Sequence, residues 1–81
     1  MSITTFLIIE LFQSGLWDSE ARQVVEEMQK EMPEMSGKWE EDIDHYPPQM
    51  KAVLWLSAKE YAVKWIDGNK PQHFARAILS Q

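Results

Sequence analysis

The residues between Glu40 and His45 are the first whose chemical types could support a function. Four carboxylates and an imidazole stand close together there, and such groups can bind a divalent cation. Their spacing does not match known cation sites, because an EF-hand loop alternates oxygen ligands around a central glycine and a zinc site needs more than one histidine or cysteine. The other histidine, His73, is distant in the sequence. We therefore expect no metal site here and interpret the segment as an acidic surface.

Nucleophilic catalysis would require a serine or threonine held beside a base that a third group orients. Ser57 lies between apolar neighbours in a helical pattern, where a hydroxyl commonly bonds to the carbonyl one turn back. No G-x-S-x-G turn is present, and the three glycines are isolated, so no phosphate-binding loop is formed. We expect neither enzymatic activity nor a bound cofactor.

The acidic side chains are concentrated in the first part of the chain. Residues 1–45 carry a net charge of −8 and residues 46–81 carry +3, within a total of −5. This acidity disfavours direct binding to nucleic acid, which depends on basic groups that displace counterions from phosphates. The acidic face is either a solvated surface or a mimic of DNA that occupies a basic groove of another protein. Its candidate residues are Glu26, Glu27, Glu31, Glu40, Glu41, Asp42 and Asp44.

The aromatic residues could form a recognition surface, because tryptophan and tyrosine are frequent in binding hot spots. Trp39, Tyr61 and Trp65 occupy inward positions of the expected helices, so we place them in the core. Trp17 precedes a helix and suits a hydrophobic staple. Trp55 lies off the main apolar stripe of its helix and is the aromatic candidate for an interface.

The length of 81 residues predicts a single domain, 1–81, which buries about 60% of the surface of its unfolded chain. There is no cysteine, so neither disulfides nor thiolate metal sites can form. The apolar run 3–12 is too short to cross a bilayer, which takes about 20 residues, and it lacks the features of a signal peptide. We expect a cytoplasmic protein that does not bind membranes.

Helical periodicity and capping residues predict an all-α fold, an irregular bundle of four to five helices joined by short loops. Ser2 or Thr4 can cap the first helix, Gly15 can end it, and residues 6–9 alone would also suit a buried strand. Asp18 or Ser19 can cap the second. The expected helices are 3–14, 19–32, a short one at 38–45, 48–67 and 71–80.

The second helix has an amphipathic stripe and is the most clearly defined element. Its inward residues are Ala21, Val24, Val25, Met28 and Met32, and Pro33 ends it. In the central helix, 48–67, Pro48 suits the first position and Gly68 the stop. Its expected inward stripe is Met50, Val53, Leu54, Ala58, Tyr61, Ala62 and Trp65. A second apolar set on the same helix comprises Ala52, Trp55, Leu56, Val63 and Ile66.

The first helix is apolar almost all round, and the central helix is apolar over more than half of its circumference. A small domain has few other elements to cover both, so part of this surface is expected to contact a second copy or a partner. A two-fold homodimer is the commonest closed arrangement. The alternative is that five helices suffice to bury it. The candidate interface residues are Phe6, Ile9, Trp55 and Val63.

A short, acidic, cysteine-free, helical chain without catalytic motifs resembles, in overall character, the small accessory proteins of bacteriophages and mobile elements. The resemblance implies modulation of another macromolecule in place of catalysis. We therefore expect a protein-interaction module that binds a protein partner and self-associates. DNA mimicry by the acidic face is the alternative.

Overall fold

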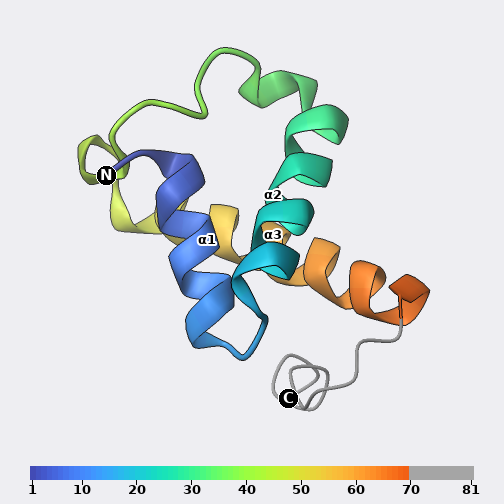
Figure 1. The fold of residues 1–81 in the computed structure, drawn as a ribbon. Coiled ribbons are helices and arrows are strands. Elements are labelled where there is room, and N and C mark those ends of the chain that lie inside the picture. Colours follow the sequence, from blue (N-terminus) through green and yellow to red (C-terminus); the bar gives the residue numbers. More distant parts are fainter. Residues whose placement is uncertain (70–81) are drawn as a thin grey trace.

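A computed structural model of the chain describes residues 1–69. These residues form α1 (Ile3–Gln13), α2 (Asp18–Glu31) and α3 (Pro48–Asn69), with single 3-10 turns at Pro33–Met35 and Ile43–His45. The all-α prediction is confirmed for this part of the chain. Each α-helix contacts the other two, and Figure 1 shows α3 crossing behind α1 and α2. Residues 1–69 contain three α-helices, and the predicted total of four to five is not confirmed, because the predicted helix 71–80 lies outside the described residues.

The start of α1 is capped by Ser2, one of its two expected caps. The Ser2 hydroxyl oxygen accepts a hydrogen bond from the backbone N–H of Thr5 at 3.1 Å, which satisfies one donor of the first turn. One face of α1 is completely buried in the core. The fully buried residues on this face are Ile3, Leu7 and Leu11.

The end of α1 is a Schellman motif centred on Gly15. The backbone N–H of Gly15 donates to the Phe12 carbonyl at 3.1 Å, and that of Leu16 donates to the Leu11 carbonyl at 3.2 Å. Gly15 has a φ of 116°, a backbone conformation that residues other than glycine rarely adopt. Leu11 and Leu16, the two positions of the apolar contact typical of this motif, are both buried in the core.

The start of α2 differs from the prediction by one residue. Asp18 is the first helical residue and Trp17 is the cap, where we expected Asp18 or Ser19 to be the cap. The carboxylate of Glu20 accepts a hydrogen bond from the backbone N–H of Trp17 at 2.9 Å. A residue of the first helical turn therefore supplies the hydrogen-bond acceptor for the N–H of the capping residue.

The buried stripe of α2 agrees with its predicted periodicity. Met32 is only half-buried, and the helix ends at Glu31, two residues before Pro33 and one residue earlier than predicted. The fully or almost fully buried residues are Ala21, Val24, Val25 and Met28.

Residues 38–45 do not form the predicted short helix, since only the 3-10 turn at their end is present. The N–H groups of Ile3 and Thr4 donate to the carbonyls of Glu41 and Trp39 at 3.0 and 3.1 Å, and the N–H of Ile43 donates to the Met1 carbonyl at 2.9 Å. These backbone groups therefore bind the N-terminal residues and cannot complete a helical ladder.

The buried positions of Trp39 and Ile43 nevertheless agree with the prediction. Pairing with the N-terminal residues holds both side chains against the core without a helix.

The long helix α3 begins at Pro48, as predicted, and the Pro47 carbonyl accepts the first hydrogen bond of the helix, from Met50 at 3.0 Å. It continues through Gly68 to Asn69, so Gly68 is not its stop. A glycine inside a helix costs about 1 kcal/mol relative to alanine, which a helix of 22 residues tolerates.

The buried face of α3 is rotated from the predicted one. Met50 and Val53, expected inside, are exposed, while Ile66, placed in the second apolar set, is buried. The buried residues recur every four positions: Leu54, Ala58, Ala62 and Ile66. Two of the four are alanines, whose small side chains allow α1 and α2 to approach the α3 backbone closely.

Candidate functional site

The side of α3 that faces away from α1 and α2 carries large apolar side chains in solvent. Met50, Val53 and Leu56 are 40%, 55% and 57% exposed. Contiguous exposed apolar surface commonly marks an interaction site. We name this region the α3 outer surface; it comprises Met50, Val53, Leu56, Lys59, Glu60, Val63 and Lys64.

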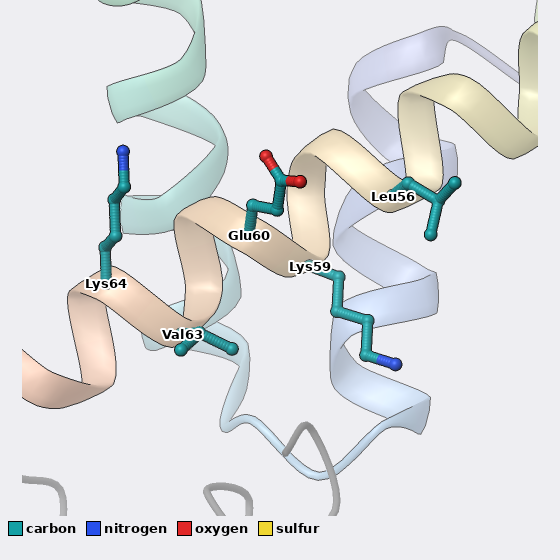
Figure 2. Close-up of a pocket in the computed structure, with 5 residues that line it drawn as sticks. All are labelled: Leu56, Lys59, Glu60, Val63 and Lys64. Carbon is teal, nitrogen blue, oxygen red and sulfur yellow. The ribbon is translucent and has the colours of Figure 1, made fainter. Parts of the chain in front are cut away.

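A hollow of about 400 Å³ lies on the C-terminal part of the α3 outer surface. Leu56 and Val63 contribute its apolar groups, and three charged side chains surround them. Figure 2 shows Glu60 and Lys64 projecting from one side of the helix and Lys59 from the other. Such an arrangement can hold an apolar side chain of a partner while the rim makes polar contacts.

Lys64 is oriented by an aromatic neighbour on the preceding turn. Its Nζ lies 5.6 Å from the centroid of the Tyr61 ring, a cation–π distance. Burial, followed by the nearby carboxylates of Glu31, Glu34 and Glu27, raises the pKa of Tyr61. Three carboxylates from α2 and the turn that follows it therefore lie near Tyr61.

The four interface candidates chosen from the sequence occupy different environments. Phe6, Trp55 and Val63 are half-buried and pack against the core, whereas Ile9 is 37% exposed on α1. Ile9 is accompanied one turn later by Phe12, which is 57% exposed. Only Val63 of the four lies on the α3 outer surface, and the role of all four in binding stays a prediction.

Val53, Leu56 and Phe12 are exposed residues that the sequence did not single out. The sequence feature that indicated exposed apolar surface was the large number of apolar residues around two of the helices. Periodicity showed that some of them must be exposed, but it did not show which ones.

The acidic segment 40–44 makes several contacts within the protein. The Asp44 N–H donates to Asp42 Oδ1 at 3.0 Å, and this bond, with smaller effects from the N-terminal ammonium and His45, holds the pKa of Asp42 below its usual value. Asp44 pairs with Lys51 at 3.8 Å. The hydroxyl of Tyr46 donates to Glu41.

The other acidic candidates lie along α2. Glu26 lines two grooves: one of about 570 Å³ shared with Glu27, Lys30 and Trp65, and one of about 240 Å³ shared with Glu40. Glu31 is exposed at the end of the helix. The fold thus brings Glu40 next to α2, while Asp42 and Asp44 contact the N-terminus and the start of α3.

Within residues 1–69, no cluster of three or more histidine, aspartate or glutamate side chains has a geometry that could hold a metal ion. His73, the second histidine, lies outside this range. Ser57 is half-buried on α3. No helix within the same range is long and apolar enough to cross a membrane.

No protein-family model, curated protein or solved structure matches the chain. Function must therefore be inferred from the geometry of the chain itself.

Proposed function

We propose that this protein binds another protein through the α3 outer surface and modulates that partner by covering part of its surface. The supporting observation is the exposure of Met50, Val53 and Leu56 at three-residue steps on a helix whose opposite face is buried. Full burial of one such side chain contributes about 1.5 to 3 kcal/mol, the scale of a binding hot spot. This role agrees with the resemblance to accessory proteins of bacteriophages and mobile elements.

Site-specific photo-cross-linking in the native cell tests partner binding. A photoreactive amino acid in place of Leu56 should cross-link a protein, because this position lies at the centre of the proposed contact. The control position is Arg22, which is exposed on α2. Equal cross-linking at the two positions, or none at Leu56, would contradict the proposal.

Self-association is the second part of the proposal, and it is supported by a separate apolar surface on α1. Ile9 and Phe12 are exposed one turn apart on a helix whose other face is fully buried. A two-fold dimer would cover this surface in both copies and leave the α3 outer surface for the partner.

Sedimentation equilibrium at micromolar concentration tests self-association. We expect about twice the chain mass of 9.5 kDa. Phe12→Glu should restore the monomer mass, and Leu56→Glu should leave the dimer intact. A monomer mass at every concentration would contradict self-association but not partner binding. Dissociation of the dimer by Leu56→Glu alone would show that the dimer contact lies on α3.

DNA mimicry by the acidic side of α2 is the second candidate function. It is favoured by the carboxylates of Glu27 and Glu31 on α2 and of Glu34 just after it, which add to the effect of burial in raising the pKa of Tyr61. In this function, these carboxylates would take the place of DNA phosphates in a basic groove of the partner.

Binding by mimicry should weaken steeply with salt, because exposed charges are screened over about 8 to 10 Å at physiological ionic strength. Neutralising Glu26, Glu27 and Glu31 together, each to glutamine, should abolish it. The matched control neutralises three other carboxylates, Glu41, Asp42 and Asp44, which already have partners within the protein. Binding that tolerates the triple change would remove this candidate.

A further inference from the structure

The predicted helix 71–80 has an apolar face and follows α3 directly in the sequence. Phe74, Ala77 and Ile78 stand at positions i, i+3 and i+4, the spacing of one helical face. The segment lies outside the described residues. An amphipathic helix is stabilised chiefly by an apolar surface that covers its apolar face, and the hollow on α3 is such a surface close to the point where the described chain ends.

The distance of the hollow from the end of α3 is within reach of this segment. α3 ends at Asn69, and Val63 and Leu56 stand six and thirteen residues before that end. At about 1.5 Å per residue, they lie about 9 and 20 Å from it along the helix axis. A helix of ten residues is about 15 Å long, so residues 71–80 can reach the hollow by running back along α3.

Pro71 favours a change of direction at the required place. A proline disfavours the α conformation at the residue before it, so the sequence predicts that the helical path stops at Lys70. The end of α3 at Asn69 agrees with this prediction. Antiparallel helices joined by about two to five residues form a common hairpin, and proline also suits the first position of its second helix.

Opposite net charges favour contact between this segment and the rest of the chain. Residues 70–81 contain Lys70 and Arg76 and no carboxylate, whereas residues 1–69 carry a net charge of −7. This attraction acts over the whole chain and does not depend on the pairing of any one lysine of α3. Charge therefore favours an intramolecular contact, while the apolar face and the reach of the segment indicate the hollow as its place.

We infer that residues 71–80 form a helix that folds back along α3, places Ile78 in the hollow, and competes with the partner for this surface. The apolar groups that receive Ile78 belong to Leu56, which is 57% exposed, and to the half-buried Val63. The contact is reversible, and the partner displaces the segment when it binds. This inference rests on the proposed function, because it concerns regulation of the same surface.

Methyl NMR spectroscopy of the full chain tests the contact. We expect nuclear Overhauser effects between the Ile78 δ1-methyl group and the methyl groups of Leu56 and Val63. Ile78→Glu should shift the methyl signals of Leu56 and Val63, and Phe74→Glu should shift them in the same direction. The matched control is Gln72→Glu, which adds the same charge on the opposite side of the predicted helix and should leave these signals unchanged.

Partner capture tests the competition. The photoreactive amino acid at Leu56 is combined with Ile78→Glu or with Gln72→Glu in the full chain, in the native cell. If the segment covers the surface half of the time, its release doubles the fraction of molecules that can bind, so Ile78→Glu should raise the cross-linking yield about 2-fold. Gln72→Glu should leave the yield unchanged.

Absence of the Overhauser effects, or equal methyl shifts in Ile78→Glu and Gln72→Glu, would overturn the inference. Capture of a partner at Leu56 would then still support the proposed function. Overhauser effects that arise only between differently labelled copies in a mixed sample would also overturn it, and would identify a second copy as the occupant.

A contact without increased capture in Ile78→Glu would overturn the inference as well, because the segment would not compete with the partner. If the probe at Leu56 captures no protein in any variant, the proposed function fails and the competition fails with it.

Discussion

The rotation of α3 about its axis can be tested by comparing two leucines that stand two positions apart. Leu54 is 2% exposed within the core, whereas Leu56 is 57% exposed on the α3 outer surface. Leu54→Ala should lower the free energy of unfolding by about 3 to 4 kcal/mol, from lost burial and the cavity left behind. Leu56→Ala should lower it by less than about 1 kcal/mol, because most of the side chain is already in water.

The expected difference between the two variants is large compared with the total stability. A chain of this length has an unfolding free energy of about 4 to 12 kcal/mol, so Leu54→Ala removes a substantial share of it. The loss also corresponds to a melting temperature lowered by about 12 °C or more for a domain of this size.

Urea denaturation followed by circular dichroism measures both variants directly. The free energy in water is obtained by linear extrapolation, and an unchanged slope shows that only stability has changed. The protein should be kept below the concentration at which it associates, because Leu56 would gain burial in a complex. A similar loss for the two variants would show that α3 presents a different face, and the α3 outer surface would no longer be a candidate site.

Three further predictions concern polar groups. Glu20→Ala should cost about 1 kcal/mol by removing the acceptor of the Trp17 N–H, while Glu20→Gln should cost less because its amide oxygen still accepts; equal losses in denaturation would contradict this. Tyr46 and Tyr61 should both ionise above the usual pKa of about 10 in an absorbance titration, and stability should fall as pH rises through the raised pKa values, less so in Tyr61→Phe. The lowered pKa of Asp42 contributes stability that is present above about pH 4 and is lost as the pH falls below it. The free energy of unfolding should therefore depend less on pH in Asp42→Asn than in the unmodified protein.

Elements with local signals could be predicted from the amino-acid sequence. Ser2 caps α1, Gly15 closes it, and Pro48 opens α3, because each acts through the backbone within one helical turn. The buried stripe of α2 was also predictable, since its apolar residues occupy a single narrow face and the rest of the helix is charged.

The conformation of residues 38–45 and the exposed side of α3 could not be predicted, because both depend on long-range contacts. The conformation of residues 38–45 depends on backbone hydrogen bonds to residues 1–4, which lie more than thirty positions away. A local sequence pattern cannot predict such bonds. The exposed side of α3 depends on packing against α1 and α2, which buries Ala58 and Ala62 and leaves Leu56 exposed on the other side of the helix. Because apolar residues surround most of α3, its periodicity fits several orientations, and packing against the other two helices selects the one that forms the α3 outer surface.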